Sequence, residues 1–351
     1  MKRVQRGLAA ALIGASLAAP AWAQSGPQAR PAELFDLQKV GDGVYAALAK
    51  PRTPINCNAA VVVLDDAVLV VDTHSRPSSA RALMAQIRTI TDKPVRFAVN
   101  THFHWDHAQG NHAYPVAFPK QVSIIASEAT RENLRTLGGG RLKDQLASTP
   151  GQIAALEAQL AKATDAATQA RLKDEIAQQK DYLAEIKGLE LTLPDLTFDK
   201  SLIIHSGDRR VVLLFLGRGH TSGDVVAWLP KERVVATGDL LHGWMPYMAD
   251  SYPKEWVATL DALDKLEFDQ IIGGHGTVKP RAHLTFFRSY LADLIAATTI
   301  ARARGETLDQ AKVSVAGALK PKYDAGMNGE FAGSVGANIE KVYQDLDAKK
   351  Y

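Results

Sequence analysis

The sequence of 351 residues contains a single cysteine, Cys57. One cysteine excludes an intrachain disulfide, so the stability of the fold must come from a packed core. Hydrophobic residues make up 46% and charged residues 23% of the chain, which is typical of an ordinary globular protein of one large or two smaller domains. Because Cys57 lies far in sequence from the histidine motifs described below, we expect it to be a small structural residue.

The chain also lacks a strong excess of charge. Its formal net charge is +3, and residues 1–23 carry three basic side chains and no acid, so removal of this segment would leave a neutral protein. A neutral balance gives no support for a nucleic acid or an anionic membrane as partner. We therefore expect a small-molecule substrate and no nucleic-acid partner.

The N-terminal apolar run is too short to span a bilayer comfortably. Residues 8–19 are apolar, but a membrane helix needs roughly 20 such residues. Basic side chains lie in residues 2–6, and Ala21-Trp22-Ala23 forms an A-x-A cleavage site. This pattern predicts a signal peptide over 1–23 with cleavage after Ala23, and it disfavours a retained membrane anchor. We expect a periplasmic or secreted protein with no membrane attachment after cleavage.

The most informative segment is Thr101-His102-Phe103-His104-Trp105-Asp106-His107, which follows an expected strand over 97–100. In extended backbone, side chains two positions apart point the same way, so His102 and His104 can bind one metal ion. After a turn, Asp106 and His107 can face a second ion. Imidazole and carboxylate groups are ligands that zinc favours.

Three further motifs place one ligand-type side chain beside glycine at the end of an expected strand. They are residues 217–224 with His220, the run Thr237-Gly238-Asp239, and Gly273-Gly274-His275-Gly276. Glycine permits the tight turn from which each ligand projects. With the histidine segment, four strand ends thus carry ligand-type side chains. Because core packing alone hardly explains this pattern, we predict that the four strand ends form one metal site.

The expected elements fall into two similar halves. Expected strands of the first half cover 44–48, 59–64, 68–72, 97–100 and 122–126, with a helix that Ser78 or Ser79 caps and that runs to about Ile90. Expected strands of the second half cover 202–205, 211–216, 225–229, 234–237 and 270–272, with a helix over 254–266. This pattern predicts an α/β protein with two face-to-face sheets and helices outside.

A stretch rich in Ala, Gln, Lys and Glu, about 149–188, separates the two halves. Thr149-Pro150-Gly151-Gln152 predicts a capped helix start with proline at the first helical position. We expect one long helix or a helical hairpin broken near Thr164-Asp165, and we favour an inserted surface hairpin over a lid or dimer arm. Beyond Lys279 we expect mostly helix, with one helix over 286–304 and two shorter ones.

The order His102-x-His104-x-Asp106-His107, His220, Asp239, His275 resembles the ligand pattern of the metallo-β-lactamase superfamily across most of residues 35–280. The resemblance implies a four-layer αβ/βα sandwich. It gives a metallo-β-lactamase domain over 24–295 with a helical insertion at about 149–188, followed by a helical C-terminal extension over 296–351. It also implies two Zn²⁺ ions per chain, with iron or manganese as alternative metals.

The resemblance further implies the role of each ligand. His102, His104 and His220 would bind the first ion, Asp106, His107 and His275 the second, and Asp239 would bridge the two. Lactone-, thioester- and phosphodiester-cleaving branches of the superfamily carry Asp at the bridging position, whereas the best-known antibiotic-hydrolysing branches carry Cys or Ser there.

The reaction that we expect is hydrolysis. A metal-bound hydroxide would attack the carbonyl of a cyclic amide or ester, with a β-lactam as first and a lactone as second choice of substrate, and Asp106 would shuttle the proton. The alternatives are a lactonase or thioesterase of the same fold, an iron-dependent sulfur dioxygenase, and a metal-stabilised binding or scaffold protein without turnover.

Residues near the ligands suggest how a pocket forms. The loop over 240–248 is apolar and aromatic, and we expect His242, Trp244 and Tyr247 to contact substrate. His242 would bind a carboxylate or donate to an oxyanion, and a purely structural role is an equal alternative. Trp105 would line the pocket mouth or wedge the histidine loop against the core.

One acid is expected to support the ligands rather than to bind metal. Asp72 ends the expected strand over 68–72. Metal-binding histidines normally donate their second ring N–H to such a group, so we expect Asp72 to fix the histidine loop by hydrogen bonds.

Overall fold

The computed structural model describes residues 34–50 and 57–347. The predicted signal peptide and its cleavage site lie outside these residues. Within the described ranges, no helix is both long enough and apolar enough to cross a membrane.

The first half of the chain forms a seven-stranded sheet in which the strands lie in chain order. Its strands are β1 (Phe35–Gly41), β2 (Val44–Ala49), β3 (Ala59–Val63), β4 (Val68–Val71), β5 (Val95–Val99), β6 (Ser123–Ser127) and β7 (Leu196–Phe198). Strands β1 to β4 pair antiparallel, whereas β4 to β7 pair parallel. The parallel arrangement places the ends of β4, β5 and β6 at one edge, where the histidine segment begins.

The second half forms a six-stranded sheet in the order β13-β12-β11-β10-β9-β8. Its strands are β8 (Ser201–Ser206), β9 (Arg209–Phe215), β10 (Val225–Leu229), β11 (Val234–Gly238), β12 (Gln270–Gly273) and β13 (Lys279–Pro280). Only β11 and β12 pair parallel, so their carboxyl ends also meet at one edge. The expected strands are therefore present, and β1, β7 and β13 are additional to them.

The two sheets pack face to face with helices on both outer faces, as predicted. Alternation along β3 shows this directly, because Val62 packs between the sheets while Val61 packs under α2 (Pro77–Ile87) and α4 (Ala113–Ala117). On the other sheet, Val234 packs between the sheets and Val235 contacts the outer helices. Both sheets are thus buried on two sides, which gives the αβ/βα order of layers.

The C-terminal helices belong to the outer layer of the second sheet. These helices are α8 (Pro253–Leu263), α9 (Ala282–Ala303), α10 (Leu308–Tyr323) and α11 (Phe331–Asp347), with the short η4 (Asp324–Gly326) after α10. All four long helices contribute to one hydrophobic cluster with Val235 and Ile271 of the sheet. The boundary expected between 295 and 296 falls inside α9, because this helix continues across it without a break.

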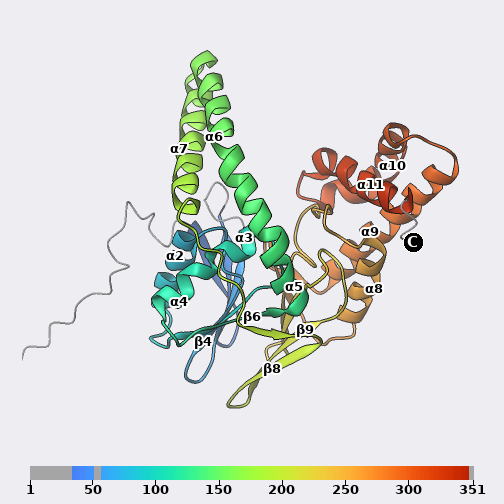
Figure 1. The fold of residues 1–351 in the computed structure, drawn as a ribbon. Coiled ribbons are helices and arrows are strands. Elements are labelled where there is room, and N and C mark those ends of the chain that lie inside the picture. The colour runs from blue at the N-terminus through green and yellow to red at the C-terminus, as the bar shows by residue number, and fades with distance from the viewer. Residues whose placement is uncertain (1–33, 51–56, 348–351) are drawn as a thin grey trace, which may run out of the picture.

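The inserted segment is a helical hairpin that projects from the body (Figure 1). It consists of α6 (Gly139–Lys162) and α7 (Ala166–Ile186), and it is entered through α5 (Glu128–Asn133) and the π-helix η3 (Leu134–Gly138). The expected break near Thr164-Asp165 is confirmed, and the Asp165 carboxylate accepts a hydrogen bond from the backbone N–H of Thr168 at the start of α7 (2.8 Å). The apolar stripe of the hairpin packs mostly on itself, around Ile153 and Ile176.

Two expected helix starts are wrong. The run from Thr149 lies inside α6, because helix continues from η3 without a gap and the Thr149 hydroxyl donates to the Gln145 carbonyl one turn earlier (2.6 Å). Ser78 does not cap α2, which begins at Pro77 and ends at Ile87. The Ser78 hydroxyl instead donates to Glu185 of α7 (2.7 Å), so it anchors the hairpin.

Candidate metal centre

The seven predicted ligands meet where the ends of strands from both sheets converge. His102 and His104 follow β5, with His104 in extended backbone, and Asp106 and His107 lie on the short helix α3 (Trp105–Ala108), which continues into η2 (Gln109–His112). The other three ligands follow β9, β11 and β12 of the second sheet. The ligand atoms form two groups, and those within each group lie within 4.8 Å of one another. The centre is therefore assembled from both halves of the chain.

The first group consists of His102, His104, His220 and Asp239. The His220 Nε2 atom lies 2.9 Å from His104 Nδ1 and 3.6 Å from Asp239 Oδ2. The imidazole rings of His102, His104 and His220 stand nearly perpendicular to one another, with centroids 4.7 Å apart. Their ring nitrogens thus converge on one point.

The second group consists of Asp106, His107 and His275. The His275 Nε2 atom lies 3.4 Å from Asp106 Oδ2 and 3.3 Å from Asp239 Oδ1. The His107 Nε2 atom lies 3.5 Å and 3.4 Å from the same two oxygens. Asp239 therefore turns Oδ1 toward the second group and Oδ2 toward the first, which is the arrangement that a bridging carboxylate requires.

Several buried atoms at the centre have the environment expected for ligands of a bound cation. His102 Nε2, His107 Nε2 and Asp239 Oδ1 are buried and have no hydrogen-bond partner among the described residues. Leaving a buried polar atom without a partner costs about 1–3 kcal/mol, so three such atoms at one place call for a ligand. Imidazole nitrogens and carboxylate oxygens in groups of four are the donor set of zinc and similar divalent ions. The residues present thus fit two metal ions.

Without an ion, the two groups differ in protonation. Burial lowers the pKa of His275, but Asp239 and Asp106 raise it to about 9. Burial raises the pKa of Asp106, but His107 and His275 lower it to about 2. In the first group, burial and neighbouring imidazoles hold the pKa values of His102 and His220 well below the usual range. Protons on the imidazoles balance the carboxylates of the second group, whereas His102 and His220 of the first group stay neutral.

Asp72 supports the histidine segment as predicted. Its Oδ2 atom accepts a hydrogen bond from His107 Nδ1 (2.8 Å), which leaves His107 Nε2 for the centre. Its Oδ1 atom accepts from the backbone N–H of Thr101 (2.8 Å). The Thr101 hydroxyl also lies 3.0 Å from His102 Nδ1, so one buried carboxylate organises two adjacent ligands.

Sequence analysis missed the corresponding support of His104. The Nε2 atom of His104 donates to Asp250 Oδ2 (2.7 Å), and Arg141 of α6 donates to both oxygens of Asp250 (2.9 and 2.7 Å). No spacing rule connects positions 104, 141 and 250. The available signal was the lone acid at Asp250, shortly after the apolar loop that follows Asp239.

The ligands from the second sheet are held by aromatic rings instead. The His275 ring stacks on Trp244 (centroids 4.6 Å apart, planes at 21°). The His220 ring meets the edge of buried Trp256 (centroids 5.5 Å apart). The Nδ1 atoms of both histidines are buried and lack a hydrogen-bond partner in the described part of the chain.

A pocket of about 510 Å³ opens onto the centre. The expected wall from the loop over 240–248 is present, and His242, Trp244 and Tyr247 all line the pocket. Trp105 lines it too, with its ring 5.7 Å from that of Tyr182 on α7. His242 is 1% exposed and burial lowers its pKa to about 3, so it is neutral at pH 7 and cannot hold a carboxylate by charge.

The base of the inserted hairpin forms another wall of this pocket. Four residues of one face of α6 line it: Arg141, Asp144, Gln145 and Ser148. The hairpin is therefore a surface projection at its tip and part of the site at its base. Cys57 is not one of the predicted ligands; it is buried beside the site, where its sulfur lies 3.6 Å from His74 Nδ1 and its thiol interacts with His107.

Parts of this chain are similar in sequence to known proteins. A linear primary-alkylsulfatase from Pseudomonas sp. (strain ATCC 19151) is 26% identical over 227 residues, which cover 60% of this chain and 40% of the relative. A metallo-beta-lactamase type 2 from Bacillus cereus is 31% identical over 108 residues, which cover 29% of this chain and 41% of the relative. The chain thus spans about two fifths of the length of these relatives.

Solved structures agree with the fold. A metallo-beta-lactamase from Pontibacter korlensis superposes with a TM-score of 0.52 at 18% identity, covering 74% of this chain and 99% of that chain. The DIM-1 metallo-beta-lactamase superposes with a TM-score of 0.51 at 16% identity, covering 74% and 97%. The family model of the metallo-beta-lactamase superfamily matches residues 52–275, more than half of the sequence, and the chain therefore belongs to this superfamily.

Proposed function

We propose that the protein is an exported, dinuclear zinc-dependent hydrolase that cleaves a cyclic amide or ester. The observation that carries this proposal is the sharing of Asp239 between two groups of ligand atoms, one oxygen toward each. When bound, two divalent ions supply a water of lowered pKa and polarise the scissile bond.

Asp106 is the residue that we propose to move the proton. It lines the pocket, and its Oδ2 atom faces His107 and His275, which leaves Oδ1 to take a proton from the attacking water. Its low pKa in the metal-free protein keeps it ionised at neutral pH, as a base must be. In Asp106→Asn, retained turnover with both ions still bound would dismiss this role.

The pocket supports a small substrate with an apolar part. The pocket lining includes Trp105, Trp244, Met245 and Tyr247, and a volume of about 510 Å³ suits a drug-sized molecule. We propose a β-lactam as the first and a lactone as the second substrate class, with His242 acting as a neutral hydrogen-bonding group rather than a cation.

A second candidate is the sulfate ester of an aliphatic alcohol. The alkylsulfatase relative aligns with 60% of this chain, a larger share than the lactamase relative's 29%. The apolar pocket wall would hold an alkyl chain while the sulfate faces the ions.

One experiment separates these candidates. Purified protein is analysed for metal and then assayed with nitrocefin, an acyl-homoserine lactone, a thioester and dodecyl sulfate. About two zinc ions per chain with turnover of nitrocefin or the lactone supports the proposal, and turnover of dodecyl sulfate alone supports the second candidate. Bound iron favours a dioxygenase, and bound metal without any turnover favours a binding protein.

Export has its own test. Expression of the full chain in a Gram-negative host, followed by N-terminal sequencing of the periplasmic fraction, should give a protein that begins at Gln24. A protein retained in the cytoplasm with residues 1–23 intact would contradict this part of the proposal.

A further inference from the structure

We propose that Arg141 of the inserted hairpin is a positioning residue for the metal ligand His104, and that it acts through Asp250. This inference rests on the proposed metal centre, but not on any substrate. The three side chains form a continuous chain of charge-assisted hydrogen bonds with distances of 2.7–2.9 Å.

Asp250 selects which nitrogen of His104 faces the centre. A carboxylate accepts hydrogen bonds only, so His104 must carry its proton on Nε2 to donate to Asp250. The Nδ1 atom is then free of a proton, and this is the atom that lies 2.9 Å from His220 Nε2 in the first group. The contact therefore fixes both the tautomer and the ring orientation that metal binding requires.

Arg141 in turn fixes Asp250. Its guanidinium donates from Nη1 and Nη2 to the two oxygens of the carboxylate, and such a planar pair sets the orientation of the acid as well as its charge. Both oxygens of Asp250 are thus held by Arg141, and Oδ2 also accepts from His104. Within the described chain, the Asp250 carboxylate has hydrogen bonds to no other group, whereas Asp72 also accepts from the backbone of Thr101.

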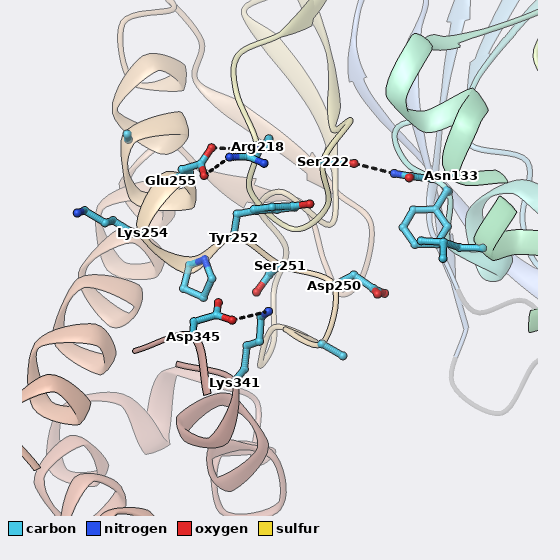
Figure 2. Close-up of a pocket in the computed structure, with 15 residues that line it drawn as sticks. Asn133, Arg218, Ser222, Asp250, Ser251, Tyr252, Lys254, Glu255, Lys341 and Asp345 are labelled. Atoms are coloured by element: carbon cyan, nitrogen blue, oxygen red, sulfur yellow. Dashed lines mark hydrogen bonds and ion pairs between the residues drawn. The ribbon is translucent and has the colours of Figure 1, made fainter. Parts of the chain in front are cut away.

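The surroundings of Asp250 leave it free to turn away if Arg141 is lost. Asp250 borders a second cavity of about 860 Å³, which is also lined by Phe103. Figure 2 shows Asp250 and Tyr252 at this cavity. Arg141 lines the metal-facing pocket, so the ion pair lies between the two spaces. The guanidinium is held over the ring of Phe103, 5.1 Å from its centroid, and Phe103 is the residue between His102 and His104. The hairpin thus reaches the first metal group at two points.

Metal affinity tests this inference more directly than turnover does. Arg141→Ala, Arg141→Lys and Asp250→Ala would be titrated with Co²⁺ in competition with a chelator, and the first-group ion is identified as the one lost in His220→Ala. We expect Arg141→Ala to lower the affinity for that ion by about 10- to 100-fold, as is usual when an outer hydrogen-bond partner of a ligand is lost. Arg141→Lys should lower this affinity by less. Guanidinium at millimolar concentration should partly restore the affinity of Arg141→Ala.

A matched control variant and a double-mutant cycle complete the design. Lys180→Ala removes an ion pair within the hairpin (Lys180–Glu157, 2.7 Å) far from the centre and should leave the affinity unchanged. In an Asp250→Ala background, Arg141→Ala should have no further effect.

The inference is overturned if Arg141→Ala lowers the melting temperature but leaves the Co²⁺ affinity within twofold of the parent, because Arg141 would then only fasten the hairpin. It is also overturned if the effects of Arg141→Ala and Asp250→Ala add. If Arg141→Ala fails to fold, the same judgement is made on Arg141→Lys. A parent protein that binds no ion refutes the proposed function itself.

Discussion

The two halves of the molecule hold their metal ligands in different ways. The ligands of the first half, His107 and His104, are oriented by Asp72 and Asp250 through hydrogen bonds of 2.7–2.8 Å, although Asp250 itself belongs to the second half. In the second half, Trp256 and Trp244 hold His220 and His275 by ring packing. The difference follows from the backbone. The first half presents four ligands from one short segment, so each side chain must be oriented separately. Each ligand of the second half projects alone from a strand end, where packing is enough.

The largest effect is expected where the halves meet. Asp239→Ala removes the carboxylate that both groups share, so both ions should be lost or greatly weakened, by more than the roughly 100-fold that loss of an outer hydrogen bond costs. Metal analysis after dialysis measures this. Asp208→Ala, in an exposed ion pair with Lys231, is the control and should retain both ions. Loss of a single ion with normal affinity for the other would show that Asp239 is not shared.

Removal of the carboxylate support in the first half should come next. Asp72→Ala leaves the Thr101 backbone N–H and the His107 ring without their acceptor, so the second-group ion should bind about 10- to 100-fold more weakly. Because these groups are buried, the free energy of unfolding should fall by about 1–3 kcal/mol for each unpaired group. Chelator competition and urea denaturation measure the two quantities. Unchanged metal affinity would place Asp72 outside the support of the centre.

The two groups should also respond differently to pH. The raised pKa of His275, about 9, means that this ring is protonated at pH 7 in the metal-free protein and must lose its proton to bind an ion. Although burial opposes it, neighbouring Cys57 and Asp106 also raise the pKa of His107 well above its usual range, so the affinity of the second group should rise by at least about tenfold per pH unit until pH 9. His102 and His220 have lowered pKa values, so the first-group ion should bind with little pH dependence near pH 7. Calorimetry in buffers of different ionisation enthalpy counts the protons, and equal release at both groups would refute the difference.

Removal of aromatic support should have the smallest effect. Trp244→Ala removes a ring stack on His275, an interaction of about 0.5–1.5 kcal/mol, so the second-group ion should bind at most about tenfold more weakly. Trp244→Phe keeps a stacking ring and should lie close to the parent in the same chelator competition. A loss as large as that of Asp72→Ala would remove the distinction between the two kinds of support.

Local pattern in the sequence was sufficient to identify the residues that converge at the candidate metal centre and to predict the layers of the fold. The seven predicted ligands lie in short motifs at strand ends, and the nearly unbroken apolar runs in β3 and β11 mark strands buried on both faces. Helix starts were less predictable, because Thr149-Pro150 has the composition of a capped start although helix already runs through it from η3. A capping motif predicts the N-terminus of a helix only where the residues before it are not themselves helical.

Partners that meet across long sequence distances could not be predicted. Asp250 is separated from His104 by 146 positions and Arg141 from Asp250 by 109, and neither residue lies in a motif. That the hairpin base lines the pocket was not predicted, for the same reason. The face of α6 that carries Asp144 and Ser148 is recognisable as a pocket wall only in the folded structure.

The most direct test of the account is the anomalous diffraction of crystals grown with zinc, measured on both sides of the zinc absorption edge. We expect two anomalous peaks per chain, one among His102, His104 and His220 and the other among Asp106, His107 and His275, with Asp239 between them. A single peak, or zinc bound away from these residues, would contradict the claim of a two-ion centre built from both halves of the chain.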